Sequence, residues 1–332
     1  MQTNAVVFKG VDQIEMLRIE MPPPGPNEVQ VKTDYSTISA GTEGWCLQNL
    51  FTWAPTPYPV VPGYQRVGTI IAVGPGVHDS KVGERVLATV GCWKGTEVKP
   101  FWGSHAAVCN TMTHEIYKIP AGCDDVDASA AVTAQVGYNA GYRPMMHTGD
   151  WFVVYGDGII GQFGAQAARS RGAKVVLVGR RPERLQAASK AGIEATVNAR
   201  SEDVISAVRR ITGRQTVTVV IDTVQTVEAQ KQYVNLLENW TGQIVYSGFT
   251  PGTCWADMAL LQQRQLTCHN VSGWTRDRID ATLALAAAGR LSLRPLLTHF
   301  VPSVRGAEMY YVIRRKSEPF VAITLDWTKE KM

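Results

Sequence analysis

Residues 151–185 have the sequence WFVVYGDGIIGQFGAQAARSRGAKVVLVGRRPERL, and this stretch decides the fold. It opens on a continuous apolar run, 151–155, of the kind found in strands that are buried on both faces. Glycines then lead directly into an alanine-rich segment with a helical pattern, and a second apolar run, 174–179, follows. A strand, a crossover helix and a second strand in this order predict two parallel strands of one sheet.

The same pattern continues on the C-terminal side. From about Asp124, helical stretches alternate with further apolar runs at 218–222 and 243–248, which predicts a doubly wound parallel sheet. Short β-rich runs separated by turns precede this region, and a mixed segment follows it. We therefore expect an α/β protein with two domains: a β-rich domain formed by residues 1–123 and 297–332, and a dinucleotide-binding domain formed by residues 124–296.

Three glycines after the first apolar run have the spacing G-x-G-x-x-G: Gly156, Gly158 and Gly161. In a strand–turn–helix context, the first permits the tight turn, the second lets the backbone approach a pyrophosphate, and the third lets the helix pack closely on the strand. The amides near Ile159 and Ile160 would then face phosphates at the positive end of the helix. The motif predicts a dinucleotide site, and the alternative is an ordinary glycine-rich turn.

The end of the second apolar run indicates which dinucleotide is preferred. NAD-binding proteins place a carboxylate there for the ribose 2′-hydroxyl, whereas this chain has Gly179 followed by Arg180 and Arg181. Arginine binds phosphate through a planar fork of donors, so the pattern predicts NADP(H). The alternative is that both arginines are solvated, and Arg184 is expected on a helix surface. We assign to the same cofactor site two residues near the end of the run at 243–248: Ser247 and Phe249.

Composition and charge argue against several other classes. Apolar residues make up 45% of the chain and the net charge is only +4, so a disordered protein and a nucleic-acid partner are not expected. The sequence has no apolar run of about 18 residues and no signal-peptide pattern, so we expect a cytoplasmic protein without a membrane partner. The six cysteines, Cys254 among them, form no C-x-x-C pair and are expected to be reduced.

Three segments resemble the medium-chain dehydrogenase/reductase superfamily, and the likeness covers nearly the whole chain. PGYQRVGTIIAVGPGVHDSKVGERV (62–86) is similar to its P-G-H-E-x-x-G signature region, STISAGTE (36–43) resembles the segment with its first catalytic zinc ligand, and residues 296–316 resemble its C-terminal lobe. Within the superfamily the chain looks most like the bacteriochlorophyllide dehydrogenase-like branch. The resemblance implies a Rossmann sheet, a β-rich GroES-like catalytic domain, a small-molecule substrate and a homodimer.

The positions that would hold catalytic zinc in the resembling family differ here. They correspond to Ala40, Tyr64 and Val136, none of which is an ordinary zinc ligand. The resemblance therefore implies a member without zinc. A metal bound by Cys92, His105 and Cys109 is a weaker alternative, because these residues match no recognised ligand spacing.

Without zinc, another group must stabilise the charge that develops on the substrate oxygen. The resemblance places Tyr64 at the lost ligand position, and we predict that it donates a hydrogen bond or a proton. It also places Thr42 in the proton-relay position, with Glu43 as an orienting or pKa-tuning partner. The alternatives are that Tyr64 only fills space and that Thr42 is a structural turn residue or binds the cofactor ribose.

Aromatic residues are frequent in the first domain, and flat aromatic faces can stack on sugars or aromatic rings. Core packing is the alternative for each of them. We assign five to a substrate pocket: Trp45, Trp53, Tyr58, Trp93 and Trp102.

Together these features predict a zinc-independent, NADP(H)-dependent oxidoreductase. It would interconvert a carbonyl and a secondary alcohol on a ring-bearing or polyol-like substrate. Two alternatives remain open: a zinc-free quinone or enoyl reductase that acts on a C=C bond, and a non-catalytic NADPH-binding sensor.

Overall fold

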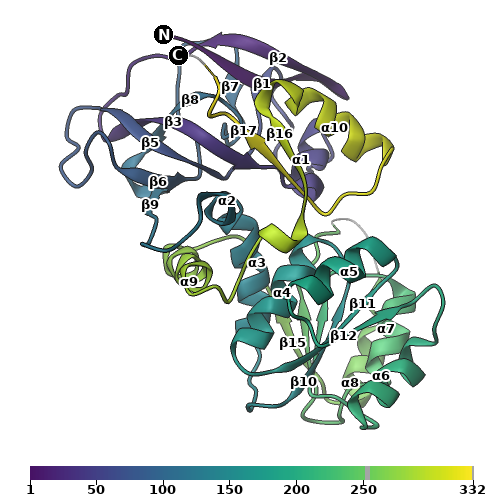
Figure 1. The fold of residues 1–332 in the computed structure, drawn as a ribbon. Coiled ribbons are helices and arrows are strands. Elements are labelled where there is room, and N and C mark those ends of the chain that lie inside the picture. The colour runs from purple at the N-terminus through teal and green to yellow at the C-terminus, as the bar shows by residue number, and fades with distance from the viewer. Residues whose placement is uncertain (251–254, 331–332) are drawn as a thin grey trace. The chain divides into compact units, whose positions relative to one another are not determined.

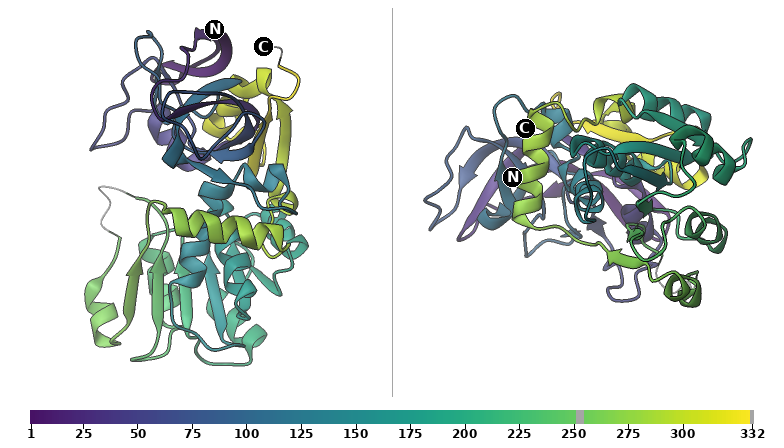
Figure 2. Two further views of the ribbon diagram at one scale, coloured as in Figure 1. Left: turned by 90° about the vertical axis from the view of Figure 1, so that its left-hand side faces the viewer. Right: turned by 90° about the horizontal axis from the view of Figure 1, so that it is seen from below.

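The computed structural model of the chain describes residues 1–250 and 255–330. It divides into two compact units, Met1–Val132 with Leu297–Met332, and Thr133–Leu296. Figures 1 and 2 show the ribbon of both. Residues 124–132, which the sequence analysis placed in the second domain, belong to the first unit. Short helix α2 (Asp125–Ala128) is tied there by an ion pair between Arg85 and Asp125.

The second unit is built on a six-stranded sheet in the order β12-β11-β10-β13-β14-β15, and all neighbouring strands are parallel. The strands, in chain order, are β10 (Trp151–Tyr155), β11 (Lys174–Gly179), β12 (Ala195–Asn198), β13 (Val219–Asp222), β14 (Gln243–Tyr246) and β15 (Thr267–Asn270). The chain starts in the middle of this sheet and moves first to one edge and then to the other. This order confirms the predicted doubly wound α/β sheet.

Helices cover both faces of this sheet, as the continuously apolar strands require. Phe152 and Val154 of β10 pack in one core cluster with residues from α3, α4 and α5, whereas Val153 and Tyr155 pack in another with residues from α6, α7 and α8. The helices are α3 (Ala131–Tyr142), α4 (Ile159–Ser170), α5 (Pro182–Lys190), α6 (Val204–Thr212), α7 (Val227–Val234), α8 (Met258–Gln263) and α9 (Arg276–Ala287).

The first unit is β-rich and contains two sheets. The larger has seven strands, along the path β16-β17-β3-β5-β6-β9 with β8 paired to β3, and the smaller has the order β2-β1-β4-β7. The strands are β1 (Gln2–Gly10), β2 (Gln13–Glu20), β3 (Glu28–Thr37), β4 (Val60–Val61), β5 (Arg66–Val73), β6 (Arg85–Ala88), β7 (Lys99–Pro100), β8 (Val108–Met112), β9 (Ile116–Lys118), β16 (Leu297–Pro302) and β17 (Ala322–Asp326).

The C-terminal segment completes the first unit. β17 pairs antiparallel with β3, where Thr324 lies beside Thr37. Helix α10 (Gly306–Arg315) packs with α1 (Ala40–Leu47), and both contribute to one hydrophobic core that also contains Phe8 and Trp327. Residues more than three hundred positions apart in the sequence, such as Phe8 and Tyr310, therefore meet in this core.

Two further observations bear on the expected location and redox state of the chain. Across residues 1–250 and 255–330, no helix is long and apolar enough to cross a membrane. The cysteines in these ranges are free thiols, whereas Cys254 lies outside the described residues.

Candidate active site

Two of the three glycines after β10, Gly156 and Gly161, lie where the chain comes too close to its neighbours for a side chain. Gly156 has φ +116°, and a Cβ there would lie 2.0 Å from Thr223 Oγ1. A Cβ on Gly161, in the first turn of α4, would lie 2.0 Å from the carbonyl oxygen of Gly156. Both positions therefore require glycine for the turn and for helix packing.

Gly158 is different, because no protein atom crowds it. An added Cβ would meet only Arg184 Nη1, at 3.9 Å. Gly158 is also the N-cap of α4, and no side chain of residues 1–250 or 255–330 caps the first amides of this helix, around Ile159 and Ile160. An exposed backbone at a glycine next to uncapped helix amides suits a diphosphate, so this turn fits a dinucleotide.

Asp157, which the sequence analysis did not assign, organises the end of β11. Its Oδ2 accepts hydrogen bonds from the main-chain nitrogens of Arg180 at 2.7 Å and Arg181 at 3.0 Å. A Cβ on Gly179 would lie 2.6 Å from Asp157 Cβ, so the carboxylate occupies the space beside this glycine. The sequence feature that could have identified Asp157 is its place as the acidic residue between the first two glycines of the motif.

The arginines of this loop have different surroundings. Arg181 and Arg184 form ion pairs with Asp157 Oδ1, at 3.5 and 3.6 Å, while the side chain of Arg180 is exposed. The expectation that Arg184 lies on a helix surface is wrong, because only 10% of its side chain is exposed. Burial, together with nearby Arg181, lowers the pKa of Arg184, and Asp157 opposes this shift.

Ser247 and Phe249 follow β14, the fifth strand along the chain in this sheet. The Ser247 amide donates to the Asp222 carbonyl oxygen at 2.9 Å, and its buried hydroxyl has no hydrogen-bond partner among the described residues. Phe249 is half exposed. The buried Asp222 carboxylate accepts hydrogen bonds from Val224 N at 2.8 Å and Gln225 N at 2.9 Å. Both predicted residues thus lie beyond the carboxyl end of the sheet, where ligands bind in such folds.

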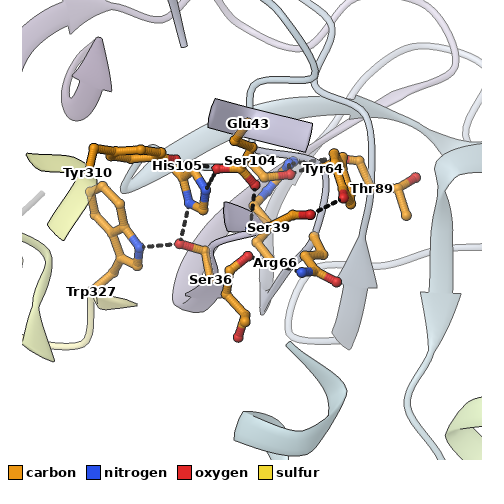
Figure 3. A network of polar contacts seen from close by, with 12 residues as sticks. Ser36, Ser39, Glu43, Tyr64, Arg66, Thr89, Ser104, His105, Tyr310 and Trp327 are labelled. Carbon is orange, nitrogen blue, oxygen red and sulfur yellow. Dashed lines mark hydrogen bonds and ion pairs between the residues drawn. The ribbon is translucent and has the colours of Figure 1, made fainter. Parts of the chain in front are cut away.

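In the first unit, Glu43 is the centre of a buried polar network (Figure 3). Its side chain is fully buried, and its Oε1 accepts from Ser39 N at 2.9 Å. Its Oε2 accepts from the phenol of Tyr310 on α10 and lies 3.0 Å from His105 Nε2. Burial, and then the Glu43 charge, raises the pKa of Tyr310 well above its ordinary value, so its phenol stays protonated as a donor.

His105 continues this network away from α1. Its Nδ1 lies 2.8 Å from Ser36 Oγ on β3, and this hydroxyl also accepts from Trp327 Nε1 at 2.8 Å. Neither His105 nor Ser36 is exposed to solvent. The sequence analysis considered His105 only as a weak metal candidate, because its partners come from distant segments.

Tyr64 lies at the edge of the same network. Its phenol donates a hydrogen bond to Ser39 Oγ, and 7% of the residue is exposed. Ser39 is the N-cap of α1, where a serine hydroxyl ordinarily accepts from the helix amides, yet it makes no such bond. The Ser39 hydroxyl therefore accepts from Tyr64 instead of from the helix amides. The sequence analysis did not assign Ser39 to the site.

The structure brings only part of the predicted catalytic set together. Glu43 is joined to Tyr64 through Ser39, whereas Thr42, on the same helix, is partly exposed and its hydroxyl has no hydrogen-bond partner among the described residues. Glu43 faces His105 and Tyr310, which agrees with an orienting role. Val136 lies on α3, whose residues from 133 onward belong to the second unit.

The donor set around Tyr64 does not suit a zinc ion. Ala40 offers no donor atom, and the Tyr64 phenol is hydrogen-bonded to Ser39. Among residues 1–250 and 255–330, no three His, Cys, Asp or Glu side chains are grouped so that they could hold a metal ion. Cys92, His105 and Cys109 form no such group.

An aromatic cluster adjoins Tyr64. The Trp102 ring meets the Tyr64 ring edge to face at 5.3 Å between centroids and packs against Phe101 at 4.5 Å. Phe51 links these rings to Trp53, at 4.6 Å, which is 60% exposed. Trp102 has φ +71°, which is an uncommon backbone conformation for a bulky residue, and such conformations cluster at functional sites.

The other predicted pocket residues have different places. Trp45 packs on Phe51 at 6.4 Å and so adjoins the aromatic cluster. Tyr58 donates its hydroxyl to two main-chain carbonyls at the end of α1, at 3.0 and 2.7 Å, which is a structural role. Trp93 is 5% exposed and packs in another core cluster, with its Nε1 donating to Val98 O at 2.9 Å. The core alternative therefore holds for Trp93, because its ring is enclosed by apolar side chains.

Arg66 is a further buried residue that the sequence analysis did not single out. It follows Tyr64 by two positions, is fully buried, and donates from Nη1 to Ser104 Oγ at 3.2 Å. Its other partners are Thr89 O, at 3.4 Å, and the Thr111 hydroxyl. Ser104 in turn donates its amide to Gly63 O at 2.8 Å, so Arg66 helps hold the turn that precedes Tyr64.

Comparisons with known proteins agree with this architecture. The Zinc-binding dehydrogenase family model matches residues 160–288, and the Alcohol dehydrogenase GroES-like domain model matches residues 25–121. A curated alcohol dehydrogenase of Moraxella sp. (strain TAE123) is 26% identical over 307 residues, which are 86% of this chain and 89% of that protein.

Solved structures show the same fold at low identity. An alcohol dehydrogenase from Escherichia coli CFT073 in complex with NADH, and a zinc-binding dehydrogenase homologue from Sinorhizobium meliloti 1021 bound to NADP, each superpose with a TM-score of 0.84. Each is 21% identical and covers 98% of this chain and 99% of the other. The two domain models, which match residues 25–121 and 160–288, establish that the chain belongs to the medium-chain dehydrogenase/reductase superfamily, as an alcohol dehydrogenase-like oxidoreductase.

Proposed function

We propose that this enzyme is a zinc-independent, NADP(H)-dependent oxidoreductase that interconverts a carbonyl and a secondary alcohol. The observation that carries the proposal is the Tyr64–Ser39 hydrogen bond. The resemblance assigns Tyr64 to the position of a metal ligand in zinc-type members of the superfamily, and this bond supports the proposal because it gives the phenol a hydroxyl partner. A phenol can supply the proton that the substrate oxygen needs when the carbon receives hydride.

The residues of the second unit would hold the cofactor. The uncapped amides of α4 suit its pyrophosphate, and the exposed Arg180 with Arg181 suits a 2′-phosphate. The bound nicotinamide supplies or accepts the hydride. NADP(H) is favoured over NAD(H) because Gly179 replaces the carboxylate that would accept from a free 2′-hydroxyl, and because the nearby Asp157 carboxylate is already bonded to main-chain amides.

In the direction of reduction, the Tyr64 phenol turns its one hydrogen from Ser39 Oγ to the substrate oxygen and gives up this proton as the alcohol forms. The Ser39 hydroxyl can then turn and donate to the phenolate, because an hydroxyl both accepts and donates. Glu43 keeps Ser39 in place through its main-chain amide. The aromatic cluster formed by Phe51, Trp53, Phe101 and Trp102 beside Tyr64 favours a ring-bearing substrate.

The test is NADPH consumption with panels of ring-bearing ketones, aldehydes, quinones and enones, followed by product analysis. We expect secondary or primary alcohols as products, formed without added metal. Saturated ketones from enones would instead identify a C=C reductase. Tight NADPH binding without turnover on any panel would favour the non-catalytic sensor.

We further propose that the protein is a homodimer. β15 is an edge strand of the parallel sheet, so its outer main-chain groups can pair with a second copy. Light scattering after size-exclusion chromatography should give twice the chain mass. A mass equal to one chain at micromolar concentration would contradict this.

A further inference from the structure

His105 supports the turn that presents Tyr64. A Cβ on Gly63 would lie 2.4 Å from His105 Cδ2, so the imidazole ring rests directly against this turn. The main chain adds two hydrogen bonds, from His105 N to Pro62 O at 3.1 Å and from Ser104 N to Gly63 O at 2.8 Å. Because Tyr64 is the next residue, the position of its backbone depends on this packing.

The same ring also acts on the partner of Tyr64. His105 Nε2 lies 3.0 Å from Glu43 Oε2, and Glu43 Oε1 holds Ser39 N at 2.9 Å. Ser39 carries the hydroxyl that accepts from Tyr64. His105 therefore contacts the supports of both the donor and the acceptor in the Tyr64–Ser39 bond. Figure 3 shows the link from His105 to Glu43 and the bond between Tyr64 and Ser39.

The hydrogen bonds indicate how the protons are arranged. Glu43 receives an N–H from Ser39 and an O–H from Tyr310, which is the environment of a carboxylate. A carboxylate only accepts, so His105 Nε2 carries a hydrogen and donates it. The Ser36 hydroxyl, which already accepts from Trp327, can donate to His105 Nδ1 and complete the chain of donors.

This series of hydrogen bonds does not form a continuous path for protons to Tyr64. Glu43 meets Ser39 at the main-chain amide, not at the hydroxyl, and an amide N–H does not pass its proton on during a reaction cycle. The network can fix geometry but cannot deliver a proton through Ser39. Small errors in the position of a reacting group are costly, so a buried support of this kind affects the rate.

We propose that His105 is a positioning residue, which with Glu43 and Tyr310 holds the Ser39 hydroxyl and the Tyr64 phenol in their reactive geometry. The kinetic part of this inference rests on the proposed function, in which Tyr64 is the donor. The structural part does not, because it concerns the order of Ser39 and Tyr64 in the enzyme as it stands.

The test compares His105→Phe, which keeps a ring but removes both nitrogens, with His105→Gln, which keeps an N–H near the position of Nε2. We expect His105→Phe to lower kcat about tenfold or more while the Kd for NADPH stays near normal. His105→Gln should recover part of this loss. Tyr310→Phe removes only a hydroxyl and should lower kcat, whereas Tyr311→Phe, at the adjacent position of α10, is the matched control and should not.

Hydrogen–deuterium exchange gives a readout that needs no substrate. The Ser39 amide should exchange about tenfold faster or more in His105→Phe and in Tyr310→Phe, and at the normal rate in Tyr311→Phe. If the unmodified enzyme turns over none of the substrates, the proposed function fails, and this exchange still decides the positioning role. Should His105→Phe fail to fold, Tyr310→Phe decides. Normal kcat together with normal Ser39 protection in a folded variant would overturn the inference.

Discussion

The glycine turn of the second unit and the polar network of the first unit differ in how far apart their residues lie in the sequence. The turn, its helix and the end of the next strand all fall within residues 151–185. In the network, Glu43 bonds to residues 62 and 267 positions away, and Ser36 to one 291 positions away. A motif held by local backbone geometry can be recognised in one sequence, whereas a site assembled by distant contacts cannot.

The first prediction tests whether the dispersed network performs the chemistry. Tyr64→Phe removes one hydroxyl and keeps the ring against Trp102, so packing is retained. If the phenol is the donor, kcat should fall by roughly a hundredfold or more, because one preorganised donor contributes about this much. Steady-state kinetics and NADPH titration check this, and NADPH affinity should stay near normal.

Thr42→Val provides the comparison for this experiment. A relay through Thr42 would make the loss in rate depend on pH, while a structural threonine would lower the melting temperature and leave the rate unchanged. Because the Thr42 hydroxyl has no hydrogen-bond partner among the described residues, we expect little change in the rate or in the melting temperature. Near-native kcat in Tyr64→Phe would show that the Tyr64 hydroxyl is not the essential proton donor.

The second prediction concerns two glycines of the local motif that look alike in the sequence. Gly161→Ala places a Cβ against the Gly156 carbonyl oxygen and should cost about 3 kcal/mol of unfolding free energy. Gly158→Ala meets only the tip of Arg184, so its stability should change little while NADPH affinity falls. Thermal or urea unfolding and cofactor titration separate the two. Equal destabilisation by both would contradict the geometry.

The third prediction tests the cofactor preference. Replacing Arg180 and Arg181 together by alanine should weaken NADPH binding at least about tenfold, because each charge-assisted hydrogen bond contributes about 1.5 to 3 kcal/mol. NADH affinity should hardly change. Of the single variants, Arg180→Ala should have the larger effect, since Arg181 also pairs with Asp157. Equal affinities of the unmodified enzyme for NADPH and NADH would exclude the proposal.

The fourth prediction expects the smallest effect. Prolonged treatment with a chelator should leave activity and melting temperature unchanged, because the donor atoms around Tyr64 do not suit zinc. Elemental analysis should find no stoichiometric zinc. Activity that is lost on chelation and restored by zinc would show that the family positions assigned to Ala40 and Tyr64 are wrong.

Sequence reasoning succeeded where a short stretch of the chain itself determines which residue types are required. Four strands of the parallel sheet and the glycines of the turn followed from apolar runs and glycine spacing, whereas the two edge strands, β12 and β15, did not. It failed for Arg184, whose burial depends on the Asp157 carboxylate, and for Trp93, which is enclosed in a core cluster. Exposure and partners are properties of packed elements, so periodicity alone did not reveal them.

The sequence by itself determined that this chain forms a doubly wound sheet with a glycine turn at α4, because φ angles and missing Cβ atoms act within a few residues. It also placed Tyr64 and Glu43 in one candidate site. Only the tertiary structure decided that the Ser39 hydroxyl accepts from Tyr64 and not from the helix amides. It also decided that His105 and Tyr310 contact Glu43. Those bonds join segments that come together only when the whole β-rich unit has folded, so their partners leave no local pattern to recognise.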